Sequence, residues 1–114
     1  MAKAIYIQRG EALDYTNSTT NSIEANAVLV MGGIVGVAGC DIPPGTKGSL
    51  HVMGVYAFPK AAGAIAAGTA LLWDGTAGTV SESGGVPLGY AAEGADADAS
   101  TVPVLLDRSA GVAE

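Results

Sequence analysis

His51, Cys40 and Asp41 are the residues of this chain whose types could support nucleophilic catalysis. A cysteine or serine attacks when a histidine takes its proton and a carboxylate orients that histidine, and such partners meet in space and not in sequence. His51 is the only histidine, and in the alternating pattern Leu50-His51-Val52 it lies opposite its apolar neighbours. We therefore expect it to face solvent or a subunit boundary. Cys40 is the single cysteine, so we expect no intrachain disulfide and a small, buried, apolar role.

Metal and phosphate sites have equally little support. Glu93, Asp96 and Asp98 offer neighbouring carboxylates, but a calcium loop needs more oxygen ligands and a fixed glycine turn, so we expect a solvated acidic loop. The segment Thr46-Lys47-Gly48 reverses the Gly-Lys-Ser/Thr order with which a P-loop holds phosphates. The glycines between residues 32 and 39 do not form G-x-G-x-x-G either. We expect no catalytic residue, no metal and no cofactor.

Trp73 beside Asp74 has the residue type of a carbohydrate-stacking platform. A lone tryptophan before a hairpin turn is more often a core or interface residue, because large aromatics contribute much of the burial in small domains and interfaces. We favour the core or interface role and keep carbohydrate binding as an alternative.

These residues would be positioned by short strands and turns. The stretch 64–92 has the clearest hairpin pattern: an apolar run at 70–73, a turn with Asp-Gly at 74–78, and renewed alternation at 79–81. Further extended segments are expected at 13–16, 27–31, 34–38, 49–58, 88–91 and 101–106. Residues 61–67 could form a helical turn or two, limited by Gly63 and Gly68. The pattern predicts an all-β fold, a small β-barrel or β-sandwich of short hairpins.

An internal repeat supports this architecture. Residues 22–30 match residues 64–72 at an offset of 42, and residues 35–38 match residues 88–91 at an offset of 53. The second copy therefore carries about eleven extra residues, around the hairpin of residues 73–85. Two copies of one unit predict pseudo-symmetric halves.

The N-terminal segment differs from the rest of the chain. Residues 3–9 alternate as in an extended strand, with apolar groups on both sides. The first nine residues have a net charge of +2 and residues 10–114 a net charge of −8. We expect an extended N-terminal arm with first strands at 1–16, one β domain at 17–109 and a frayed tail at 110–114. The interface residues that we predict are Lys3, Ile5, Tyr6, Ile7 and Arg9 of the arm, and Trp73.

Composition limits the classes of function. The chain of 114 residues has 21 alanines and six aromatic residues, so its interior buries little area per side chain and association is expected to add stability. The net charge of −6 argues against a nucleic-acid partner. The N-terminus lacks the pattern of a signal peptide, and no apolar run approaches 18 residues, so we expect cytoplasmic synthesis and no membrane partner.

Several short patterns resemble one family. The opening MAKAIYIQRGEALDYTN, the segment VYAFPKA at 55–61, the hairpin WDGTAGTV at 73–80, and the later LGYA at 88–91 and VPVLL at 102–106 are similar to small tailed-phage capsid cement or head decoration proteins. The resemblance covers nearly the whole chain. It implies a β-rich, non-enzymatic virion protein, often a homotrimer, that binds the outside of the capsid made by the major capsid protein and bridges capsid subunits.

Members of that family also carry a label as recombinases of the RecA/RadA type. This sequence contradicts that label, because it has no P-loop, is too short for an ATPase core with a parallel sheet, and is acidic. A recombinase-type function is therefore the disfavoured second alternative.

Overall fold

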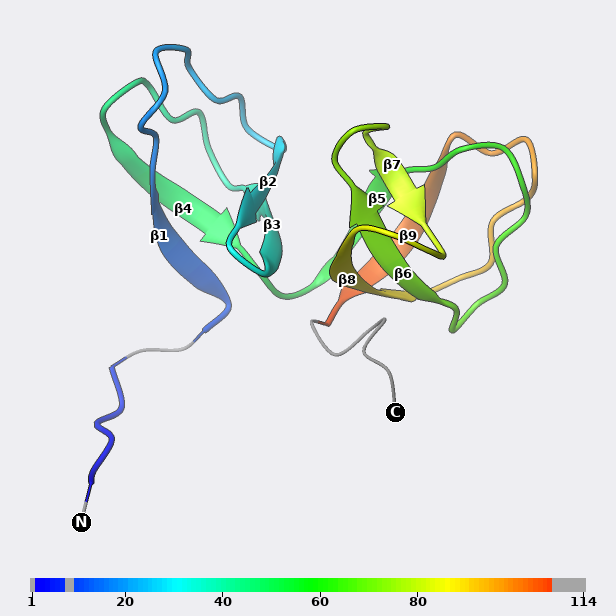
Figure 1. Ribbon diagram of the computed structural model, residues 1–114, viewed down its shortest axis with the longest axis horizontal. Helices are drawn as coiled ribbons and strands as arrows, with labels where there is room; N and C mark the ends of the chain where they lie inside the picture. The colour runs from blue at the N-terminus through cyan, green and yellow to red at the C-terminus, as the bar shows by residue number, and fades with distance from the viewer. Residues whose placement is uncertain (1, 8–9, 108–114) are drawn as a thin grey trace.

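Short alternating segments separated by glycine-rich turns form nine β-strands and no helix within the part of the chain that the structure describes, residues 2–7 and 10–107 of a computed structural model (Figure 1). The strands are β1 (Ala12–Thr16), β2 (Val28–Met31), β3 (Ile34–Ala38), β4 (Lys47–His51), β5 (Val55–Pro59), β6 (Ala70–Asp74), β7 (Thr79–Ser81), β8 (Val86–Ala91) and β9 (Thr101–Leu106). The all-β prediction is confirmed. None of the described residues belongs to a helix that could span a membrane.

Two antiparallel sheets divide these strands. The first sheet has the order β1-β4-β3-β2, and the second has the order β5-β9-β8-β6-β7. The sheets contact each other mainly through β3 and β8. This arrangement is sandwich-like, because neither sheet forms a closed barrel.

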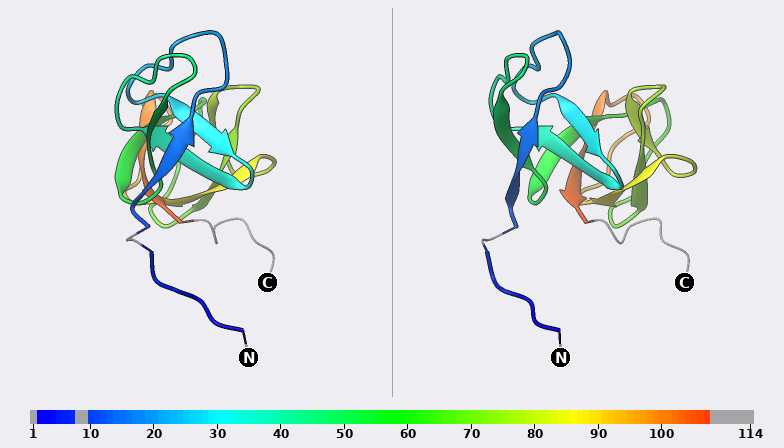
Figure 2. Two further views of the ribbon diagram at one scale, coloured as in Figure 1. Left: turned by 90° about the vertical axis from the view of Figure 1, so that its left-hand side faces the viewer. Right: turned by 60° about the vertical axis from the view of Figure 1, so that its left-hand side comes forward.

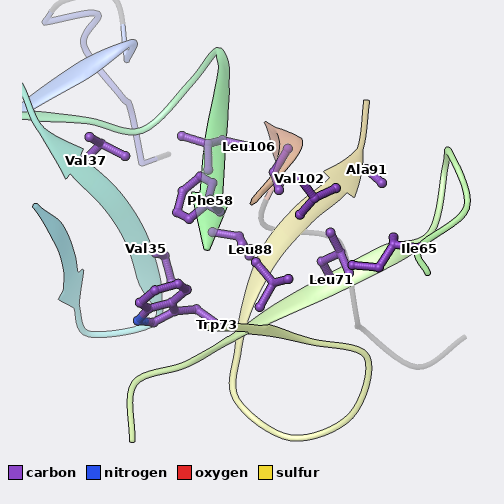
Figure 3. Packing of buried hydrophobic residues seen from close by; sticks show 12 residues of the cluster. Val35, Val37, Phe58, Ile65, Leu71, Trp73, Leu88, Ala91, Val102 and Leu106 are labelled. Atoms are coloured by element: carbon purple, nitrogen blue, oxygen red, sulfur yellow. The ribbon is translucent and has the colours of Figure 1, made fainter. Parts of the chain in front are cut away.

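The main hydrophobic cluster joins the two sheets. Val35 and Val37 of β3 pack against buried residues of the second sheet, among them Trp73 (Figure 3). The members from the second sheet and its loops are Phe58, Ile65, Leu71, Trp73, Val80, Leu88, Ala91, Val102, Val104 and Leu106. We call residues 10–54, which form the first sheet and its loops, the first half of the chain. Ala38, Ile42 and Leu50 are its other buried apolar side chains.

The internal repeat is confirmed by equivalent backbone hydrogen bonds. Asn26 donates its N–H to the carbonyl of Ala38, and Gly68 donates its N–H to the carbonyl of Ala91. Both donors have a positive φ, 73° at Asn26 and 84° at Gly68, a backbone conformation that favours Gly and Asn. The donors are 42 residues apart and the acceptors 53 residues apart, as the sequence offsets predict. Isolated bridges repeat likewise, Ile23–Ile42 in one half and Ile65–Ala95 in the other.

Each strand of the first sheet has an equivalent in the second. The strands β1, β2, β3 and β4 correspond to β5, β6, β8 and β9, and both sheets place them in the same order. The additional strand of the second half is β7, which lies within the eleven extra residues. β7 pairs antiparallel with β6 and also meets the end of β5 through a parallel bridge between Lys60 and Val80.

Among the residues that the structure describes, the two buried polar side chains also occupy equivalent places, one residue after β1 and one residue after β5. Asn17 donates from Nδ2 to the carbonyls of Asn21 and Ile42, both at 2.8 Å. Lys60 donates from Nζ to the carbonyls of Asp96 and Ala99, both at 3.1 Å. Each buried side chain therefore has its own donors satisfied by carbonyls of neighbouring loops, as buried polar groups require.

Three expectations for local structure are wrong. The segment 49–58 is not one strand: it is divided between β4 and β5, because Gly54, with a φ of 116°, lies where the chain passes from the first sheet to the second. Residues 61–67 form no helix, since two glycines leave too few residues for stable turns. Residues 3–7 form no strand, because no neighbouring strand pairs with them in the described structure. Residues 8–9 and the predicted tail at 110–114 lie outside the described residues.

Candidate functional site: an exposed arm and free sheet edges

The N-terminal arm, defined here as residues 2–7, leads away from the two sheets (Figure 2). Its large apolar side chains are almost fully exposed: Ile5 at 82%, Tyr6 at 79% and Ile7 at 82%. Lys3 is also exposed, and Arg9 lies outside the described residues. Three neighbouring apolar side chains in water favour burial against another surface, and an extended backbone can add to a sheet edge. The arm therefore has the properties of a segment that binds another chain.

Each sheet also presents free edges. β1 and β2 are the outer strands of the first sheet, and β5 and β7 are the outer strands of the second. An edge strand carries backbone N–H and C=O groups that point away from its partner and can pair with a further strand. β5 is protected in part, because Pro59 has no N–H to offer and β7 bridges to Lys60.

Trp73 lies in the core and not on an open surface. It is 8% exposed, packs edge-on against Phe58 with ring centroids 5.8 Å apart at 63°, and lies opposite Val80 of β7 in the strand register. Figure 3 shows it beneath Val35, where the two sheets meet. The ring thus offers no open face on which a sugar could stack, and it anchors one sheet of the chain against the other.

The nucleophile candidates do not form a catalytic arrangement. Asp41 accepts a hydrogen bond at Oδ1 from the N–H of Ala25 at 2.8 Å, so its carboxylate holds a loop. His51 is half-buried, and its imidazole packs so closely over Gly39 that a Cβ at that position would collide with the ring. The expectation of a buried cysteine is wrong: Cys40 is exposed, because it lies in the bend after β3 and not in the strand.

The acidic loop is solvated as the sequence predicts. Glu93, Asp96 and Asp98 are exposed. Among the residues that the structure describes, no three His, Cys, Asp or Glu side chains lie close enough together to hold a metal ion. Lys60 engages the loop carbonyls and not these carboxylates.

Sequence reasoning missed an exposed apolar patch on the second sheet. Val55 of β5 and Leu105 of β9 are direct cross-strand partners, and both are exposed, as is Met53, two residues before Val55. Alternation in VPVLL marks Leu105 as facing opposite to its buried neighbours, but only the register places it beside Val55. The sequence signal was therefore incomplete without the strand pairing.

A family model described as phage cement protein matches residues 7–106. No curated protein and no solved structure matches the chain. The family match covers both sheets and begins at the last described residue of the arm.

Proposed function

The chain belongs to the phage cement protein family, and from this we propose that it binds the outer surface of the assembled capsid and stabilises contacts between capsid subunits. The family is structural and its members stabilise capsids. A non-enzymatic role accords with the described structure, where Asp41, His51 and Lys60 make structural contacts. The protein is then a component of the virion, made in the host cytoplasm and placed on the capsid surface.

The observation that carries the proposal is the exposed arm. Ile5, Tyr6 and Ile7 are apolar and extended and lie outside both sheets, which suits strand addition to a neighbouring subunit or to a capsid protein. The first nine residues, with a net charge of +2, and residues 10–114, with a net charge of −8, also favour contact with different surfaces. Any ligand that binds only the assembled state stabilises it by mass action, so many weakly bound copies can hold a shell together.

The proposed partners are the major capsid protein and further copies of this chain, as a homotrimer. The composition supports self-association, because 21 alanines and six aromatic residues give each chain a core of small side chains. The net charge of −6 disfavours nucleic acid as a partner.

Deletion of residues 2–9 tests the role of the arm. We expect the truncated protein to keep its β-sheet circular dichroism spectrum and to lose binding to undecorated phage heads, measured by co-sedimentation. The control is the variant Ile5→Val/Ile7→Val, which keeps the apolar character of the arm and should decorate heads as the full chain does. Undiminished decoration by the truncated protein would remove the arm from the binding mechanism.

A further inference from the structure

The second half of the described chain, residues 55–107, has a strand, β7, that the first half, residues 10–54, lacks. In the second half, β7 pairs with the side of β6 that faces away from β8, and it adds the buried side chain of Val80 to the core. In the first half, β2 and β3 are joined directly by the turn Gly32-Gly33, so β2 has no strand equivalent to β7.

Burial of equivalent side chains records this difference. Four residues of the first half are only partly buried, although their equivalents in the second half are buried. The pairs are Ile23 and Ile65, Tyr15 and Phe58, Leu29 and Leu71, and Met31 and Trp73. Leu29 and Met31 lie on the face of the first sheet that Ala38 and Leu50 share, opposite to the face on which Val35 and Val37 meet the second sheet, and this face is short of a cover where β7 would lie.

The edge of β2 is able to accept a strand. Ala38 donates its N–H to the carbonyl of Ala27, so the alternation of an antiparallel ladder turns the backbone groups of Leu29 and Met31 toward β3. The N–H and C=O groups of Val28 and Val30 then point away from β3. Within the described residues, no strand pairs with this side of β2.

We propose that the N-terminal arm of a second copy of this chain occupies the place beside β2 that β7 occupies beside β6. Residues 2–7 are extended and carry Ile5, Tyr6 and Ile7 at about four-fifths exposure. Ile5 and Ile7 share one side of an extended segment. They lie next to Met31, as Val80 lies next to Trp73, the equivalent of Met31 in the second half. Ala4 and Tyr6 then lie on the other side of the arm, next to Val30.

The donor must be another copy because of strand direction. β7 runs antiparallel to β6 and parallel to β5, so a strand in the equivalent place runs parallel to β1. A parallel neighbour of β1 within one chain needs a crossover connection of about a dozen residues. Only residues 8–11 separate the arm from β1, so the arm of the same chain cannot take this position.

Charge also favours this pairing. The first nine residues carry Lys3 and Arg9 and no acidic residue. The first half, residues 10–54, holds the acidic residues Glu11, Asp14, Glu24 and Asp41 and one basic residue, Lys47, a net charge of −3. Residues 55–114 have a net charge of −5, so opposite charges favour contact between the arm of one copy and either half of another, and the free edge of β2 selects the first half.

This inference deepens the proposed function, since it names the partner of the arm, and it is tested without capsids. Two variants are mixed, both with Cys40→Ser: one has Ala4→Cys or Tyr6→Cys in the arm, and the other has Val30→Cys on β2. We expect a disulfide between the two chains under mild oxidation, because directly opposed residues have Cβ atoms about 4.5–5.5 Å apart. The matched control replaces Val30→Cys by Thr76→Cys, in the exposed turn between β6 and β7, and should give no more than collisional cross-linking.

Solution mass gives the second measurement. The variant Ile5→Asp/Ile7→Asp should associate at least about tenfold more weakly than the full chain, because each isoleucine loses its burial, whereas Ile5→Val/Ile7→Val should retain association. Equal cross-linking of Val30→Cys and Thr76→Cys would overturn the proposal. So would a chain with both Ala4→Cys and Val30→Cys that cross-links only within itself, or an oligomer that the aspartate variant leaves intact.

The two proposals fail separately. Loss of head binding with an unchanged oligomer would assign the arm to the capsid and overturn this inference, while the proposed function stands. An arm exchanged between copies in a protein that ignores phage heads would leave this inference intact and overturn the proposed function.

Discussion

At the scale of single residues, equivalent positions in the two halves perform the same task with different chemistry. Asn17 and Lys60 each donate two hydrogen bonds to loop carbonyls, one through an amide and the other through an ammonium group. Gly36 and Gly89 are also equivalent, and a Cβ at either would collide with the backbone carbonyl of the neighbouring strand, at His51 or Leu105. Geometry has been kept where side-chain identity has changed.

Trp73→Ala tests the core role at this scale. We expect the free energy of unfolding to fall by about 3–5 kcal/mol, because the substitution leaves a cavity between the sheets beside Phe58. Urea unfolding followed by circular dichroism measures this change. Val55→Ala, at a residue that is 57% exposed, is the control and should shift stability by less than about 1 kcal/mol. A stable Trp73→Ala protein that no longer self-associates would instead identify Trp73 as an interface anchor.

At the scale of elements, β7 is the difference between the halves. It pairs with β6, bridges to Lys60 at the end of β5, and supplies Val80 to the core. The second half therefore has its own cover, and the first half does not. The same four-strand order thus gives one self-sufficient sheet and one sheet that remains partly exposed.

Removal of β7 should make the second half resemble the first. Replacing residues 74–86 by Gly-Gly, the turn that joins β2 and β3, should expose Leu71 and Trp73 in part and lower the urea midpoint. We also expect stronger self-association, measured by light scattering, because β6 gains a free edge. The control Thr76→Ser leaves β7 in place and should behave as the full chain. An unchanged midpoint would show that β7 adds nothing to the core.

The sequence predicted most elements, since turn residues bound them. Asp74-Gly75 and Gly32-Gly33 marked both hairpins, and the repeat offsets located the insertion that holds β7. The division of 49–58 was not predictable from alternation, because the residues on both sides of Gly54 have strand character and belong to different sheets. The exposure of Cys40 likewise depends on the bend after β3, which local composition does not encode.

Of the two surfaces in the proposed contact, only the arm was predictable from the sequence. The arm was evident from its charge and its apolar residues on both sides. A place for it beside β2 follows only from the sheet order and from the partial burial of Leu29 and Met31. Both depend on contacts between residues far apart in the chain, which periodicity does not contain.

At the scale of the whole molecule, the distribution of charge separates the arm from the body. The first nine residues have a net charge of +2, and residues 10–114 have a net charge of −8. Contact between an arm and another body therefore has a favourable long-range electrostatic component in addition to apolar burial.

Ionic strength should change association in a predictable direction. The Debye length falls from about 30 Å at 0.01 M salt to about 10 Å at 0.1 M, so added salt should weaken self-association by slowing its formation. Sedimentation velocity at the two salt concentrations measures the effect. Lys3→Gln, which removes a charge and keeps the length of the side chain, should reduce the salt dependence. Association that strengthens with salt would indicate that apolar burial alone drives it.

The unequal duplication has a consequence for the geometry of assembly. A chain that donates its arm at one place and accepts an arm beside β2 at another makes a head-to-tail contact, in which each copy uses two different surfaces. Such contacts close into a ring when the rotation between neighbours divides a full turn, and otherwise they continue as an open polymer. The size of the assembly is then set by the angle between the arm and β2, and in a closed ring every arm and every β2 edge is paired.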